Sequence, residues 1–213
     1  MTDLDAAAQT PTQTNDALFS DVRFESFGMT EALLLGVQDL AYQQPTAVQQ
    51  QVFGPVFDGR DVIVQSQTGS GKTAAFCLPV LSRLDASVKK VQALCLAPTR
   101  ELALHVATEA ARLARHTGLR VAPIYGGASI QAQIDALRAG VHFVVGTPGR
   151  VLDMYRRGHL KTEALRFAIL DEADEMLSMG FWEEVTGILD LLPTPRQTLL
   201  FSATLPPSIE TAA

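Results

Sequence analysis

The sequence predicts an α/β domain with a mostly parallel central sheet flanked by helices on both faces. Short apolar, β-branched runs that read as strands occur at 61–65, 91–97, 120–125, 142–146, 167–170 and 197–201. Strands buried on both faces show such near-continuous apolar runs. Segments of helical periodicity separate them, at about 73–84, 99–116, 129–139, 148–157 and 174–192. Ligands of such sheets bind at the carboxyl ends of the strands.

Two helices and a leader are expected before the first strand. Thr30 opens one apolar-periodic stretch, and Pro45 begins a second helical segment that runs to Phe57. Residues 1–22 carry four aspartates and neither lysine nor arginine. A segment of this composition buries too little apolar surface to fold alone. We therefore expect a disordered acidic leader over 1–22 and a single domain over 23–213.

The composition is that of an ordinary globular protein. Of the 213 residues, 47% are hydrophobic and 19% are charged. No apolar run approaches the roughly 20 residues needed to cross a bilayer, and the start of the chain lacks the features of a signal peptide. Cys77 and Cys95 each stand alone among apolar neighbours, as buried free thiols do. These features predict a cytoplasmic protein without membrane contact.

The net charge of −6 is unusual for a protein that binds nucleic acid. The leader contributes −4 of it, and three of the other acids cluster at Asp171, Glu172 and Asp174. Any surface for nucleic acid must therefore be local.

The first predicted strand runs into a loop and helix that are typical of phosphate binding. The residues concerned are Ser66, Gln67, Thr68, Gly69, Ser70, Gly71, Lys72 and Thr73. Backbone N–H groups of such a loop cradle phosphate oxygens, and its glycines permit close approach. Lys72 is expected to bridge the β- and γ-phosphates, and Thr73 to bind Mg²⁺. The alternative is a Gly/Ser turn in which Lys72 is a solvated charge, and Ser66 replaces the usual first glycine.

The fifth predicted strand, 167–170, leads into acidic residues. In P-loop nucleotide sites an aspartate at such a strand end holds Mg²⁺ opposite the loop threonine, which is the role expected of Asp171. Glu172 is placed to orient or deprotonate an attacking water. Alone, these acids could equally form the first turn of a helix. The phosphate loop upstream favours the nucleotide site.

Asp171-Glu172-Ala173-Asp174 is the signature of the DEAD-box family of RNA helicases, and the chain from about 24 to 210 resembles the N-terminal RecA-like domain of that family. The resemblance implies a P-loop ATPase that uses ATP and Mg²⁺ and releases ADP. It implies catalytic roles for Lys72, Asp171 and Glu172, and metal binding by Thr73 and Asp171.

The segment before the phosphate loop resembles the adenine-binding Q motif of the family. It comprises Phe24 and, within residues 42–49, Gln44 and Gln49. The amide of Gln49 can present a donor and an acceptor to adenine, and the ring of Phe24 can stack on the base. Ala41 replaces a frequent glycine. Gln49 on an exposed helix face and Phe24 as a hydrophobic staple are the alternatives.

Three strand ends resemble the RNA-contacting motifs of the family. Their residues are Pro98, Thr99, Arg100, Gly126, Gly127, Thr147, Pro148, Gly149 and Arg150. Helix N-termini and glycine turns of this kind suit phosphate and ribose but read few bases, so the implied RNA binding follows the backbone without sequence specificity. Each element alone could be an ordinary cap or turn.

The last predicted strand ends in Ser202-Ala203-Thr204, which resembles the family motif that couples the nucleotide and RNA sites. The hydroxyls of Ser202 and Thr204 are expected to bond to Asp174, and a helix cap is the alternative. The motifs of the second RecA-like domain, including its arginine finger, do not occur in these residues. That domain is an expected partner, and this chain alone is expected to bind nucleotide but hydrolyse it poorly.

Two other functions fit parts of the sequence. A non-catalytic nucleotide- or RNA-binding module needs neither Glu172 nor a complete Mg²⁺ site, and intact Lys72, Thr73, Asp171 and Glu172 oppose it. A GTPase is opposed by Phe24 and Gln49 and by the lack of an Asn-Lys-x-Asp guanine-reading sequence.

Overall fold

The computed structural model describes residues 22–67 and 69–210. Its centre is a six-stranded sheet in the order β1-β6-β5-β2-β4-β3, and every pair of neighbours is parallel. The strands are β1 (Val62–Gln65), β2 (Ala93–Leu96), β3 (Val121–Ile124), β4 (Phe143–Gly146), β5 (Phe167–Leu170) and β6 (Gln197–Ser202). The predicted parallel sheet is confirmed. The leader expected over 1–22 lies outside the described residues except for Val22.

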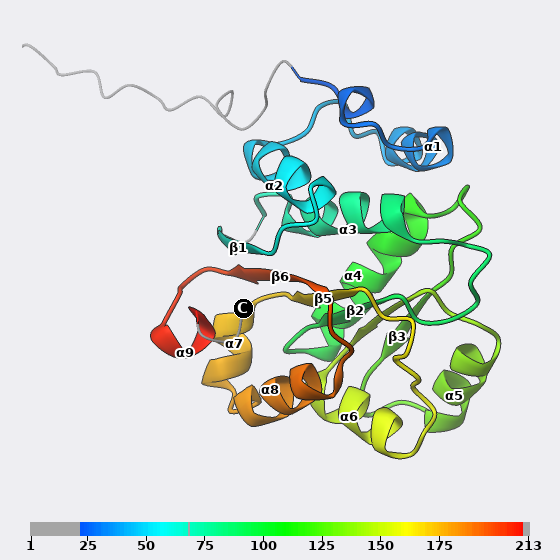
Figure 1. Cartoon of the computed structure of the whole chain (residues 1–213), viewed down its shortest axis with the longest axis vertical. Helices are drawn as coiled ribbons and strands as arrows, with labels where there is room; N and C mark the ends of the chain where they lie inside the picture. The colour runs from blue at the N-terminus through cyan, green and yellow to red at the C-terminus, as the bar shows by residue number, and fades with distance from the viewer. Residues whose placement is uncertain (1–21, 68, 211–213) are drawn as a thin grey trace, which may run out of the picture.

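Helices cover both faces of the sheet (Figure 1). One face carries η2 (Phe24–Phe27), α1 (Glu31–Asp39), α2 (Ala47–Phe57), α3 (Lys72–Arg83) and α4 (Arg100–Leu113). The other carries α5 (Ile130–Arg138), α6 (Pro148–Arg156), α7 (Ala173–Ser178), α8 (Trp182–Leu191) and α9 (Pro207–Glu210). No helix among the described residues is both long and apolar enough to cross a membrane.

The inner strands supply both hydrophobic cores, which explains their unbroken apolar sequences. In β2, Ala93 and Cys95 pack under α1–α4, whereas Leu94 and Leu96 pack under α5–α9. Successive side chains of a strand point to opposite faces, so a strand covered on both sides has no polar alternation. Cys77 and Cys95 are buried free thiols, as expected.

Residues 174–192 form two helices, so the single helix predicted there is wrong. α7 ends at Ser178 and α8 begins at Trp182, with Gly180 between them at a φ of 81°. The N–H of Phe181 bonds to the carbonyl of Met176, and that of Gly180 bonds to the carbonyl of Leu177. These two bonds are the Schellman termination, which a glycine in the left-handed region permits.

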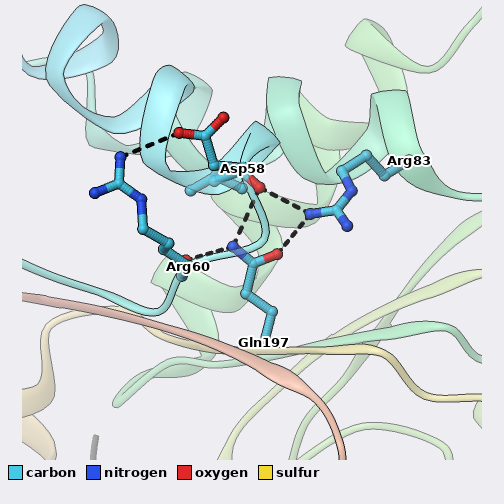
Figure 2. Close-up of polar contacts among 5 residues, drawn as sticks. Asp58, Arg60, Arg83 and Gln197 are labelled. Atoms are coloured by element: carbon cyan, nitrogen blue, oxygen red, sulfur yellow. Dashed lines mark hydrogen bonds and ion pairs between the residues drawn. The ribbon is translucent and has the colours of Figure 1, made fainter.

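A polar network joins α2 and α3 to the amino-terminal end of β6 (Figure 2). The guanidinium of Arg83 donates to the carbonyl of Val56 and to Oε1 of Gln197, both at 2.7 Å. Gln197 in turn donates to the carbonyls of Val56 and Arg60, and Arg60 pairs with Asp58. The network fixes α2 and α3, the two helices that flank the phosphate loop, against the sheet.

Candidate nucleotide and RNA site

The site lies along the carboxyl edge of the sheet, and the strand order divides that edge into two halves. The loops after β1, β6 and β5 carry 66–73, 202–204 and 171–174, and these strands are neighbours. The loops after β2, β4 and β3 carry 98–100, 147–150 and 126–127. We call these the nucleotide half and the RNA half. Parallel strands place all six loops at one edge, as ligand sites of such sheets require.

The phosphate loop leaves β1 and enters α3 through two glycines in the left-handed region. Gly69 has a φ of 80° and Gly71 a φ of 86°. A Cβ atom on Gly71 would lie 2.7 Å from Nε2 of Gln49, so a side chain there would displace the amide of Gln49 and would also be strained at this positive φ. α3 then begins at Lys72, and its free N–H groups face the loop as in phosphate sites. Thr68, expected in this loop, lies outside the described residues.

The Q-motif segment holds the phosphate loop in place. The hydroxyl of Thr46 donates to the carbonyl of Ser70 at 3.0 Å, and Nε2 of Gln49 donates to the carbonyl of Gly71 at 3.1 Å. Thr46 and Gln49 also form a reciprocal capping box at the start of α2, in which Oε1 of Gln49 accepts from the N–H of Thr46. Helix α2 therefore begins at Ala47, with Pro45 outside it. Gln49 is 4% exposed, so the alternative of an exposed helix face is wrong.

A cavity of about 380 Å³ lies beside this segment. It is lined by Phe24, Gln44, Gln49 and Gly71 among others, so the predicted adenine-binding residues do gather at one place. Phe24 is only 3% exposed, and its ring centroid lies 6.4 Å from that of Phe53. Phe24 thus belongs to the core and also borders the cavity.

Two residues that sequence reasoning missed form the far wall of this cavity. The hydroxyl of Tyr42 donates to Oε1 of Glu109 at 2.9 Å. Burial, followed by the charge of Glu109, raises the pKa of Tyr42 above its usual range. Glu109 also borders a second cavity, of about 330 Å³, together with Lys72 and Asp171. Glu109 therefore lies where the cavity beside the Q-motif segment meets the cavity beside Lys72 and Asp171.

Lys72, Thr73 and Asp171 line the second cavity together. Lys72 is 7% exposed, and its Nζ donates to the carbonyl of Ser66 at 3.2 Å. Asp171 is 2% exposed, and burial raises its pKa to about 6 although the charge of Lys72 opposes the shift. Its buried Oδ1 makes no hydrogen bond within the described part of the chain. A buried acceptor without a partner, in a cavity that Thr73 also lines, fits Mg²⁺, which prefers oxygen ligands.

Glu172 follows in a strained backbone conformation. Its φ of 52° and ψ of 55° are in the left-handed region, which a non-glycine residue rarely adopts. Burial, hydrogen bonding with Glu175 and the charge of Asp171 raise its pKa to about 7. A carboxyl group with a pKa near neutrality can take a proton from water.

Asp174 connects the acidic end of β5 to the end of β6. Its N–H donates to the hydroxyl of Ser202 at 3.1 Å, and its Oδ2 accepts from both the N–H and the hydroxyl of Thr204 at 2.9 Å. Burial raises the pKa of Asp174, but the hydrogen bonds with Ser202 and Thr204 outweigh burial and hold it below its ordinary value. The contacts expected between these three residues are present.

The RNA half consists of caps and turns in which Arg100, Gly126, Gly127 and Gly149 are exposed, whereas Pro98 and Pro148 are buried. The hydroxyl of Thr99 accepts from the N–H of Leu102 and caps α4, whereas the hydroxyl of Thr147 makes no cap bond at the start of α6. Gly127 has a φ of 74°. Arg100 is exposed, and its guanidinium lies 5.0 Å from the ring centroid of Tyr125.

A further residue, which sequence reasoning missed, ties two of these loops together. Gln133 of α5 exchanges hydrogen bonds with the backbone N–H and carbonyl of Tyr125, just before the glycine turn. Its Oε1 also accepts from Arg150 at 3.3 Å. Gln133 is 7% exposed, so it positions these loops and does not itself face solvent.

The fold and this edge define a RecA-like P-loop NTPase domain. A family model described as DEAD/DEAH box helicase matches residues 46–212. The chain therefore belongs to the DEAD/DEAH box helicase family.

Named relatives agree with this assignment. The chain is 46% identical over 189 residues to the DEAD-box ATP-dependent RNA helicase CshA of Streptococcus pneumoniae, and the match covers 89% of this chain and 36% of that protein. It is 47% identical over 189 residues to the ATP-dependent RNA helicase DeaD of Haemophilus influenzae, covering 88% and 31%. A solved DEAD box protein from Methanococcus jannaschii superposes with a TM-score of 0.85 at 39% identity, covering 89% and 52%. The chain thus spans about a third of the length of these curated relatives.

Proposed function

We propose that residues 23–213 are the ATP-binding N-terminal domain of an ATP-dependent RNA helicase that unwinds short RNA duplexes in the cytoplasm. The observation that carries the proposal is the cavity shared by Lys72, Thr73 and Asp171, with its unpartnered buried carboxylate oxygen. Such an oxygen requires a cation, a proton or a hydrogen-bond donor, and a hydrated Mg²⁺ ion meets this need.

The residues of the nucleotide half divide the work. Gln44 and Gln49 hold the adenine against Phe24, and the loop from Ser66 to Gly71 binds phosphate oxygens with its N–H groups. Lys72 moves from the carbonyl of Ser66 to the β- and γ-phosphates. Thr73 and Asp171 hold Mg²⁺, which when bound neutralises charge on the phosphates. Glu172 orients the attacking water and accepts its proton, and its raised pKa suits that step.

The residues of the RNA half bind the sugar-phosphate backbone. Thr99 and Thr147 present helix N-termini, the turn at Gly126 and Gly127 presents backbone N–H groups, and Arg100 and Arg150 supply charge. Pro148 forms the first residue of α6, and Gly149, which follows it and is exposed, leaves room for an RNA strand at the start of this helix. Asp174, Ser202 and Thr204 couple ATP binding to RNA affinity, and their contacts link two neighbouring loops of the nucleotide half.

Hydrolysis by this chain alone is slow on this account. The basic side chains that line the cavity are Lys72 and His105, and no arginine borders it within the described residues. An arginine against the γ-phosphate adds about a thousandfold or more to the rate of such enzymes. A second RecA-like domain is the proposed source of that arginine.

Two measurements on the 213-residue chain test the proposal. Titration with fluorescent ADP should show saturable, Mg²⁺-dependent binding that Lys72→Ala weakens about tenfold or more. ATP hydrolysis should stay near background with and without RNA. Binding that is indifferent to Lys72→Ala would refute the site, and robust RNA-stimulated hydrolysis would refute the need for a second domain.

A further inference from the structure

A third cavity, of about 500 Å³, lies away from the two described above, at the opposite, amino-terminal edge of the sheet. Three loops surround it: the one before β2, the one between α5 and β4, and the one between α6 and β5. Val91, Leu137 and Val141 form its apolar floor. The loops after the strands, which carry the nucleotide and RNA halves, contribute nothing to it.

The rim of this cavity is basic, unlike the chain as a whole. It carries Lys89, Lys90, Arg138, His159 and Lys161, with Glu163 as the one acid that lines it within the described chain. The full sequence contains four lysines, so three of the four lie here, on a protein of net charge −6. Three ammonium groups around one concave space create a local positive potential that favours anions.

These lysines form no ion pair among residues 22–67 and 69–210. The ion pairs among the described residues all use arginine or histidine, never lysine. They are not needed to cap helices either, because the N–H groups of Gly140, Gly158 and His159 already bond to carbonyls in the last turns of α5 and α6. The lysines are exposed and leave their charges free for a ligand.

The two adjoining helices lead from the RNA half to this cavity. α5 and α6 begin beside the turn at Gly127 and at Pro148, and both end at the basic rim (Figure 1). Each has nine residues and spans about 13 Å. An RNA strand that leaves the RNA half and follows these helices therefore reaches the cavity within a few nucleotides.

We propose that the cavity rimmed by Lys89, Lys90 and Lys161 is an auxiliary RNA site, which binds the phosphate backbone of RNA that extends beyond the RNA half. Lysines contact phosphates as point charges. The floor has no phenylalanine, tyrosine or tryptophan for base stacking, so this binding is independent of sequence. The inference rests on the RNA binding proposed above and adds a second contact surface to it.

The test compares a short and a long RNA on the 213-residue chain. Oligouridylates of about eight and about twenty-four nucleotides, the short one sized to a single binding site, are titrated by fluorescence anisotropy. The variant Lys89→Gln/Lys90→Gln/Lys161→Gln is compared with Arg23→Gln/Arg112→Gln/Arg115→Gln, which removes the same charge from exposed positions away from the cavity. Thermal melting of each variant checks that it folds.

The lysine variant should bind short RNA like wild type and long RNA less tightly. Three phosphate contacts on a single strand contribute about −2 to the slope of log K against log salt. Between about 50 and 200 mM salt, wild-type affinity for long RNA should therefore fall about 16-fold more than that of the variant. The arginine control should keep the wild-type slope.

Other results would overturn the inference. Equal losses on short and long RNA, or an equal loss in the arginine control, would indicate general electrostatics. NMR titrations with tripolyphosphate and with a glutamate decapeptide test whether the cavity binds an anion other than RNA. Shifts at the amides of Val91 and Gly158 with either probe, but not with long RNA, would assign the cavity to a free phosphate compound or an acidic protein segment. Failure of short RNA to bind wild type would instead refute the RNA half.

Discussion

The two halves of the carboxyl edge differ in how deeply their polar groups are buried. In the nucleotide half, Lys72 and Asp171 are almost fully buried and the pKa of Asp171 is raised by burial to about 6. In the RNA half, Arg100 and the glycine turn at 126–127 are exposed, and its residues include no carboxyl group.

The difference fits the ligands that we propose for the two halves. Stabilising a triphosphate and activating water require groups held in a low dielectric, where charge interactions are strong and pKa values move. Following a solvated backbone requires only N–H groups, hydroxyls and exposed cations. Substitutions in the nucleotide half should therefore have large and specific effects, and single substitutions in the RNA half small ones.

Lys72→Ala should have the largest effect. Loss of a charge-assisted bond worth about 1.5–3 kcal/mol weakens nucleotide binding about 10- to 150-fold. RNA affinity should not change, because Lys72 lies on the other half of the edge. Fluorescent ADP titration measures the nucleotide affinity, and fluorescence anisotropy measures the RNA affinity. Lys161→Ala is the control for ADP binding. An equal loss of both affinities would remove the distinction between the halves.

Asp171→Asn should stabilise the folded protein while weakening Mg²⁺-dependent nucleotide binding less than Lys72→Ala does. The folded-state pKa of about 6 lies above the ordinary 3.8, so the ionised carboxylate opposes folding. The contribution that favours folding is complete below pH 3.8 and is lost as the pH rises through about 6. A shift of about two units corresponds to about 3 kcal/mol at pH 8.

Urea unfolding at two pH values measures this effect. The gain of the Asp171→Asn variant over wild type should be about 3 kcal/mol at pH 8 and about 1 kcal/mol at pH 4.5, where the folded carboxyl is neutral but the unfolded one is still mostly ionised. A variant that is less stable than wild type at pH 8 would show that the Asp171 carboxylate is satisfied within the protein.

Arg100→Gln should have a smaller effect, confined to RNA. Loss of one phosphate contact makes the salt slope of RNA binding shallower by about 0.7 and lowers affinity a few-fold at low salt. ADP affinity should be unchanged. Arg115→Gln, an exposed charge on α4, is the matched control, and equal behaviour of the two variants would exclude Arg100 from the RNA surface.

Ser202→Ala should have the smallest effect. It leaves the N–H of Asp174 without its partner, at a cost of about 1 kcal/mol in the free energy of unfolding. Ser178→Ala, whose hydroxyl makes an exposed bond, should cost less. Urea unfolding compares them. A larger loss for Ser178→Ala would show that the Asp174–Ser202 contact contributes little.

Local patterns in the sequence were enough to predict the strands and both halves of the edge. The six strands lie within the predicted ranges to one or two residues, because parallel strands covered on both faces show uninterrupted apolar runs. Two features had a local signal that was overlooked: the break at Gly180, and the Thr46-x-x-Gln49 capping box, which explains why Gln49 is buried.

Other features could not be predicted from local patterns. Tyr42 and Glu109 are 67 residues apart in sequence and meet only because α4 packs beside the Q-motif segment. In sequence, Gln133 is an ordinary polar residue of an amphipathic helix. Its role depends on contacts with Tyr125, which follows β3, and with Arg150 of α6, and these arise only from the folded arrangement. The basic cavity likewise combines three loops that no single motif connects.

Hydrogen–deuterium exchange of the 213-residue chain tests the division of the edge most directly. Mg²⁺ and ADP should protect 66–73 and 171–174, and RNA should protect 98–102, 126–127 and 147–150. Protection of the loops after β2, β3 and β4 by Mg²⁺ and ADP, or of the phosphate loop by RNA alone, would contradict the account.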